Sequence, residues 1–211
     1  MMLRNRWFIL AVLFLVRFCL GYQFQSAGSV APFLVSDFKL DYREIGTLVG
    51  LFMLPGLILA IPAGMLGKRF GDRRLVMMGM ATMILGAVFS GAAQTHAFVS
   101  IGRLISGIGA VFLVVLMAKM VTDWFAGKEL FVGMAIFIIG WPVGIAAAQA
   151  TQAALAERGG WRDVFDLTAI MVTFSLVAMA ALYRDAPTRM NASLTPTARL
   201  SRSEKIGRAH V

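Results

Sequence analysis

Two arginines stand within long apolar runs of this sequence, and they are the residues best suited to bind a solute. Arg17 lies about 15 Å along a helix that would begin near Trp7, close to the centre of a lipid bilayer. An arginine at that depth costs roughly 2.5–3.5 kcal/mol on insertion scales, so it needs a polar surrounding. The same helical face carries Gly21, Gln25 and Gly28. We interpret this stripe as the wall of a water-filled pathway, and a structural hydrogen-bonded role for Arg17 is the alternative.

Arg103 lies less deep in a later apolar run and is followed by Ser106 and Gly107, small residues that let helices approach closely. A structural role, in which Arg103 caps carbonyl groups or pairs with a neighbouring helix, stays open beside a role in binding. The acidic residues all lie at or outside the ends of the apolar runs, so two guanidinium groups without a carboxylate partner predict an anionic solute. Arg-x-x-x-Gly occurs at 17–21 and again at 103–107, an echo typical of transporters built from inverted repeats.

A third feature is the stretch 64–74, Gly-Met-Leu-Gly-Lys-Arg-Phe-Gly-Asp-Arg-Arg, which gathers positive charge between two apolar runs. Cytoplasmic loops of membrane proteins carry an excess of Lys and Arg, so this stretch predicts a cytoplasmic turn. The residues that we expect to act together in it are Gly64, Lys68, Arg69, Gly71, Asp72, Arg73 and Arg74.

The elements that position these residues are predicted to be membrane-spanning helices. The chain is 59% hydrophobic and 15% charged, with a mean hydropathy of +0.77, whereas soluble domains are nearer half apolar and a quarter charged. Its apolar runs are long enough to cross about 30 Å of hydrocarbon, where only helices and closed barrels satisfy their backbone hydrogen bonds. We predict an all-α membrane protein with a 3+3 inverted-repeat bundle of six helices, at 7–35, 45–66, 75–93, 97–122, 130–154 and 164–183.

The distribution of positive charge orients these helices. Fourteen Lys and Arg residues fall on the side of the two termini, and four fall on the other side. This asymmetry predicts that both termini are cytoplasmic in a multi-pass protein of the bacterial inner (plasma) membrane. Residues 1–185 form the predicted bundle, and 186–211 form a polar cytoplasmic tail or linker. The last six residues, 206–211, match one reading frame of a common sequencing adapter, and we interpret them as an artefact.

Other classes of protein fit the sequence less well. The net charge of +9 could indicate nucleic-acid binding, but the basic residues flank apolar spans, where the membrane explains them. His96 and His210 stand far apart, so we expect no metal site, and no motif for a cofactor is present. No span pairs a serine with a histidine, so we expect no enzyme. The alternative to a transporter is a six-helix channel or assembly subunit that oligomerises around a pore.

The predicted helix at 130–154 carries its own signals. Pro142 removes a backbone donor and should bend the helix, and Gly140 and Gly144 form a Gly-x-x-x-Gly face. We interpret these three residues as a helix-packing motif without contact to a solute.

Four segments resemble the major facilitator superfamily. The stretch at 64–74 resembles the family's loop motif Gly-x-x-x-Asp-Arg-x-Gly-x-Arg-Arg, and 103–109 resembles its Arg-x-x-x-Gly-x-Gly motif. Gly-Trp-Pro-Val-Gly at 140–144 is similar to Gly-Pro-x-x-Gly, and Gly-Trp-Arg-Asp-Val-Phe at 160–165 is similar to the usual start of the sixth helix. The order of these segments makes the set specific, and the resemblance covers nearly all of the predicted bundle.

The resemblance implies that this chain is the amino-terminal half of a twelve-helix transporter, with a carboxy-terminal six-helix half as its partner. In the family the two halves rock around a central site that is lined on this side by helices 1 and 4, the helices of Arg17 and Arg103. The helix 4 arginine is tied to proton coupling, and the helix 5 motif to packing and leak prevention. Within the family, the run from Gly21 to Ser26 and the Asp-Trp-Phe at 123–125 are most similar to the cyanate and nitroimidazole-type anion branch.

One position departs from the family pattern. The loop motif is thought to latch this half to the other half in the outward-facing state, and its aspartate accepts hydrogen bonds from a helix start. This sequence has Lys68 at that position, which reverses the charge. We therefore expect a latch that is weaker or rebuilt on Asp72.

Overall fold

The computed structural model describes residues 3–125 and 127–186, and the regular structure within them is helical. Seven helices follow one another: α1 (Leu3–Ser29), α2 (Ala31–Phe38), α3 (Tyr42–Phe70), α4 (Asp72–Gly91), α5 (His96–Trp124), α6 (Lys128–Gly159) and α7 (Trp161–Leu182). All except α2 are long and apolar enough to cross a membrane, which confirms the predicted all-α fold with six spans. The predicted tail at 186–211, including the adapter-like end at 206–211, lies outside the described residues apart from residue 186.

The first predicted span is interrupted in the structure. The sequence predicted one continuous helix over 7–35, whereas α1 ends before Val30 and α2 starts after it. Pro32 lies in the first turn of α2, where its ring removes a backbone donor and clashes with the turn before it. Val30 accordingly leaves helical geometry, with φ −101° and ψ 12°. The prediction of a single helix was therefore wrong, and α2 is a short separate element.

Two connections are much shorter than predicted. Gly71 alone joins α3 to α4, and Gly160 alone joins α6 to α7, with φ of +89° and +97°. Glycine adopts these positive values without the steric penalty that other residues meet. The predicted helices on either side of Gly71 ended at 66 and began at 75, so most of the basic stretch is helical rather than a loop.

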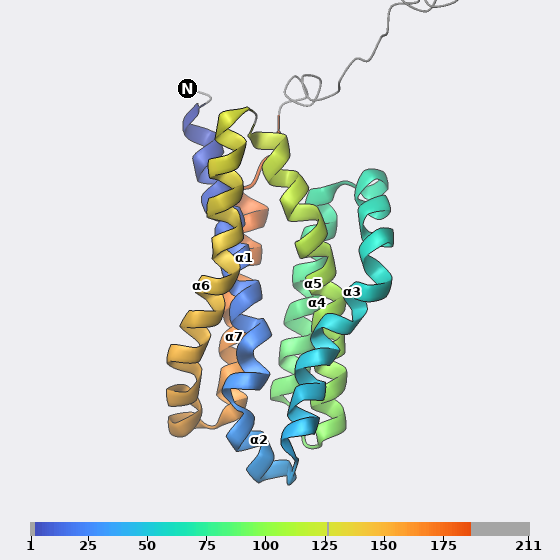
Figure 1. Cartoon of the computed structure of the whole chain (residues 1–211), viewed down its shortest axis with the longest axis vertical. Coiled ribbons are helices and arrows are strands. Elements are labelled where there is room, and N and C mark those ends of the chain that lie inside the picture. The colour runs from blue at the N-terminus through green and yellow to red at the C-terminus, as the bar shows by residue number, and fades with distance from the viewer. Residues whose placement is uncertain (1–2, 126, 187–211) are drawn as a thin grey trace, which may run out of the picture.

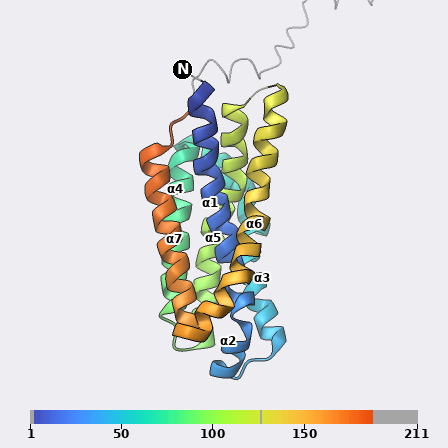
Figure 2. The same ribbon diagram turned by 90° about the vertical axis from the view of Figure 1, so that its left-hand side faces the viewer.

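The long helices form one bundle, in which α1 and α5 each pack between two other long helices (Figure 1). α1 packs on α6 and α7, α5 packs on α3 and α4, and α4 also packs on α7. Figure 2 shows α1 between α7 and α6. The start of α1, the end of α7 and the α3–α4 turn lie at one end of the bundle, and α2 lies at the other end (Figure 1). The described chain therefore leaves the bundle at the end where it entered.

The two Arg-x-x-x-Gly segments occupy equivalent crossings in this arrangement. Gly21 of α1 lies against the backbone carbonyl of Trp141 in α6, and Gly107 of α5 lies against the backbone carbonyl of Phe52 in α3. In both cases a Cβ atom would clash with that backbone, so only glycine fits. The contact of α1 with α6 thus repeats the contact of α5 with α3, as expected for two related three-helix units.

The predicted packing motif of α6 also faces α1. Gly140 lies against the side chain of Arg17 and the carbonyl of Phe14, and Gly144 lies against the carbonyl of Phe18. Pro142 is inside α6, between these two contacts. The two glycines let α1 and α6 approach closely, and they bring Arg17 next to the α6 backbone.

Gly107→Ala is expected to destabilise the protein by about 1–3 kcal/mol, because the new methyl group overlaps the α3 backbone. Gly50→Ala is the matched control, since a Cβ at Gly50 meets nothing within 4 Å. That control should leave stability unchanged or raise it by up to about 1 kcal/mol. Thermal unfolding of both purified variants measures the difference, and equal melting temperatures would contradict the close crossing.

Candidate functional site

Arg103 is enclosed by three helices and is only 1% exposed. Its Nε donates to the carbonyl of Leu48 at 3.2 Å, Nη1 donates to the carbonyl of Gln23 at 3.0 Å, and Nη2 donates to the carbonyl of Phe24 at 2.8 Å. Its Cζ lies 4.5 Å from the centre of the Phe52 ring. The guanidinium of Arg103 therefore ties α1 and α3 to α5, and every one of its nitrogen atoms donates to a carbonyl.

Arg17 occupies the corresponding position in the other unit, with different surroundings. Its Cζ lies 5.1 Å from the centre of the Phe137 ring and 5.4 Å from that of Trp141, both on α6. Its Nε and Nη1 are buried, and they have no hydrogen-bond acceptor among the described residues. No carboxylate of the described part of the chain pairs with Arg17 or Arg103. Buried donors are normally paired, so Arg17 needs an acceptor from outside this set of residues.

A row of aromatic rings joins the two arginines. Trp141 lies 5.1 Å from Phe24, and Phe24 lies 5.6 Å from Phe52, between ring centres. Arg17 contacts the first ring of this row, and Arg103 contacts the last. The row crosses α6, α1 and α3 and separates the two guanidinium groups.

An apolar cavity of about 240 Å³ opens between α3 and α5, at the end of this row. Its lining residues are Phe52, Met53, Gly56, Ala60, Gly107, Ala110, Val111, Val114, Val115 and Trp141. Apart from the indole N–H of Trp141 and the weakly accepting sulfur of Met53, none of these side chains can donate or accept a hydrogen bond. Trp141 belongs both to this cavity and to the surroundings of Arg17.

The remaining residues of the predicted stripe do not all face one open pathway. Gly21 is buried against α6, whereas Gln25 is half-buried and its side-chain amide lies beside Gly28. Gln23, which the sequence did not single out, is 1% exposed and donates to the carbonyl of Met83 at 2.9 Å and to Oγ of Ser106 at 3.1 Å. A glutamine in the middle of an apolar run indicates a buried polar contact, and here that contact joins α1 to α4 and α5.

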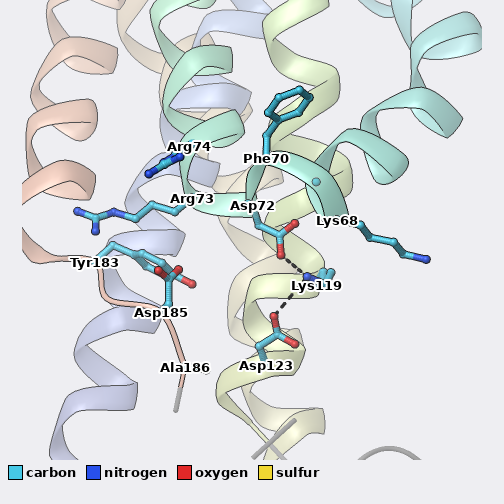
Figure 3. A pocket seen from close by; sticks show the side chains of 12 residues that line it. Lys68, Phe70, Asp72, Arg73, Arg74, Lys119, Asp123, Tyr183, Asp185 and Ala186 are labelled. Carbon is cyan, nitrogen blue, oxygen red and sulfur yellow. Dashed lines mark hydrogen bonds and ion pairs between the residues drawn. The ribbon is translucent and has the colours of Figure 1, made fainter. Parts of the chain in front are cut away.

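A second cavity, of about 500 Å³, lies beside the α3–α4 turn (Figure 3). Asp72 at the start of α4 pairs with Lys119 of α5, and Lys119 also lies 3.7 Å from Asp123. Lys68 points away from this cluster (Figure 3) and forms no ion pair with the described residues. Gly64, one helical turn earlier, packs on α5. The acid nearest this turn is therefore already engaged within the same bundle.

The other basic residues of the turn divide into bound and exposed groups. Arg73 donates through Nη2 to the carbonyl of Ala180 in α7 at 2.7 Å, which ties α4 to α7. Arg69 lies over the ring of Phe70 at 5.3 Å, and both are exposed. Arg74 is exposed and lines the cavity. Lys68, Arg69 and Arg74 remain available to a neighbouring negative group.

The segment that leaves α7 closes one side of this second cavity. Tyr183 is buried, and this burial raises the pKa of its phenol above the usual range, so the hydroxyl stays protonated. Trp124 donates through Nε1 to the carbonyl of Arg184 at 3.1 Å. The chain beyond α7 is thus fixed against the end of α5.

Comparisons with known proteins agree on one family. The model of the Major Facilitator Superfamily matches residues 13–208. A probable L-galactonate transporter of Escherichia coli is 29% identical over 79% of this chain and 37% of its own length. The human choline/ethanolamine transporter FLVCR2 is 24% identical over 87% of this chain and 37% of its own length. The crystal structure of a bacterial homologue of the human lysosomal transporter Spinster, inward-facing and unoccupied, matches with a TM-score of 0.77 at 20% identity, over 87% of this chain and 44% of that one. The chain therefore spans well under half the length of these proteins.

Proposed function

Since this chain belongs to the Major Facilitator Superfamily, we propose that it is the amino-terminal six-helix half of a secondary transporter that carries a small anion by alternating access. The carboxy-terminal half is its partner in this proposal, and the lipid bilayer surrounds both. The coverage of its relatives supports a half, because the match with the L-galactonate transporter takes in 79% of this chain but only 37% of that protein.

The unpaired donors of Arg17 are the observation that supports an anionic solute. Two equivalent Arg-x-x-x-Gly segments exist, and among the described residues the guanidinium of Arg103 has carbonyl acceptors whereas Nε and Nη1 of Arg17 have none. A guanidinium with open donors binds carboxylate or phosphate oxygen atoms through charge-assisted hydrogen bonds. The relative named as a probable L-galactonate transporter supports only the negative charge of the proposed solute, since galactonate is a monoanion at neutral pH.

The proposed orientation has both termini in the cytoplasm of a bacterial cell, with the protein in the inner membrane. The end of the bundle that holds the α3–α4 turn carries Lys68, Arg69, Arg73 and Arg74, and this excess of positive charge supports the cytoplasmic side.

Counterflow in proteoliposomes tests the proposal. The protein expressed from its complete gene is reconstituted with a high internal concentration of an unlabelled organic anion, and uptake of the labelled anion is followed. A transporter that alternates between two states accumulates label transiently, whereas a six-helix pore only equilibrates it. Equilibration without transient accumulation would exclude alternating access.

Lys68→Asp is expected to shift the conformational equilibrium of the full-length protein toward the outward-facing state. Lys68 is exposed and unpaired among the described residues, and Asp72, the acid within the stretch 64–74, is engaged by Lys119. The substitution restores an acceptor at that position. Thiol labelling of cysteines engineered at the outer helix ends measures the shift, with Lys68→Met as a control that removes the positive charge without adding a carboxylate. Unchanged labelling in Lys68→Asp would contradict a latch at this turn.

A further inference from the structure

We propose that the solute is an organic monoanion with an apolar body, whose charged group binds Arg17 and whose body occupies the cavity between α3 and α5. This inference rests on the proposed transport function and narrows its substrate class. It follows from three observations: the number of available guanidinium groups, the position of Trp141 and the chemistry of the cavity lining.

The number of arginines that can bind a ligand indicates how many negative charges the solute has. Three of the five N–H donors of Arg103 are taken by backbone carbonyls, and its side chain is only 1% exposed, so a ligand does not reach this residue. Arg17 retains Nε and Nη1 without an acceptor among the described residues. One guanidinium with open donors matches one carboxylate or sulfonate group, because Arg103, the other arginine in the interior of the described apolar spans, is enclosed and bonded to carbonyls.

The position of Trp141 indicates where the apolar body of the solute lies. Its ring lies 5.4 Å from Cζ of Arg17, and the same residue lines the cavity between α3 and α5. A solute held by Arg17 at one face of the indole can therefore extend along the ring into the cavity. The volume of about 240 Å³ is below the roughly 300–1,000 Å³ of pockets for drug-sized ligands, which favours a small solute.

The residues that line the cavity between α3 and α5 indicate that the body of the solute is apolar. α3 contributes Phe52, Met53 and Ala60, and α5 contributes Val111 and Val114, with no hydroxyl, amide or charged group among them. A hydroxylated chain in this cavity would lose its water without gaining hydrogen bonds, whereas a hydrocarbon chain gains from burial. The cavity therefore selects against sugar acids and in favour of alkyl or aryl acids.

Calorimetric titration of the purified full-length protein with hexanoate and gluconate tests the inference. The two probes are six-carbon monoanions that differ in five hydroxyl groups, so charge and chain length are matched. We expect hexanoate to bind at least tenfold more tightly than gluconate, and we expect Arg17→Met to remove the binding of hexanoate.

Ala60→Phe distinguishes a loss of binding caused by a filled cavity from a loss caused by misfolding. Ala60 lines the cavity, so a phenyl group there should weaken hexanoate binding at least tenfold and leave the binding of the shorter propionate unchanged. Ala81→Phe is the matched control, because Ala81 is exposed on α4 and lies outside the cavity lining. Equal loss of both acids in Ala60→Phe, or equal effects of the two variants, would overturn the assignment of the cavity.

The outcomes distinguish this inference from the proposed function. Tighter binding of gluconate, lost in Arg17→Met, would overturn the apolar body and leave an anion transporter. Binding of either acid that is unaffected by Arg17→Met, or binding of neither acid, would overturn the role of Arg17 and the inference with it.

Discussion

Arg17→Met is expected to reduce anion uptake by about 10- to 100-fold while the protein keeps or gains stability. The guanidinium has two buried donors without acceptors, so its removal breaks no hydrogen bond among the described residues. It also removes a charge whose transfer to the bilayer interior costs roughly 2.5–3.5 kcal/mol or more. Loss of a charge-assisted hydrogen bond to the solute, at about 1.5–3 kcal/mol, corresponds to the expected fall in uptake.

Initial uptake rates in proteoliposomes and melting temperatures of the same preparations measure the two effects. Arg17→Lys is the informative control, because lysine keeps the charge but not the planar set of donors, and it should retain part of the uptake. A large fall in melting temperature of Arg17→Met would indicate that Arg17 is a structural residue. Full uptake by that variant would remove Arg17 from the binding site.

Arg103→Met is expected to affect stability rather than solute binding, and to lower the free energy of unfolding by about 2–4 kcal/mol. Three hydrogen bonds from one buried side chain hold α1 and α3 to α5, and hydrogen bonds to charged groups contribute about 1.5–3 kcal/mol each before the gain from removing a buried charge. For a protein of this size, that loss lowers the melting temperature by roughly 5–15 °C.

Melting temperatures of Arg103→Met and Arg17→Met, compared side by side, test this balance. Arg103→Lys should rescue little, because an ammonium group cannot reach three carbonyls that lie on two helices. An unchanged melting temperature together with lost uptake would place Arg103 in transport rather than in the scaffold, and it would favour the family's link between this arginine and proton coupling.

The spans and their order could be predicted from the sequence because hydropathy is a local property. The apolar runs around Phe52, Leu113 and Phe137 each exceed the length that a bilayer requires, so their existence did not depend on tertiary contacts. The break near Val30 has a local signal in Pro32, but hydropathy does not register it because the apolar run continues through the break. The short connections at Gly71 and Gly160 were missed because a single glycine with positive φ can replace a whole predicted loop.

The roles of the two arginines could not be read from the sequence in the same way. The acceptors of Arg103 come from Gln23, Phe24 and Leu48, which are distant in the chain, and only the crossing of three helices brings them together. The stripe from Arg17 to Gln25 was correctly placed on one helix, but helix spacing does not say which neighbour each face meets. Gly21 meets α6, whereas Gln23, on another face of α1, meets α4 and α5.

The equivalent crossings at Gly21 and Gly107 have a consequence for the history of the molecule. If one ancestral three-helix unit was duplicated and inserted in opposite orientations, it began with two identical arginines. A change in the nearby acceptors is then enough to bond one arginine to carbonyls, as in Arg103, and to leave donors of the other without acceptors among the described residues, as in Arg17. If Arg17 binds the solute as proposed, changes around it can alter solute preference without disturbing the contacts that Arg103 makes between α1, α3 and α5.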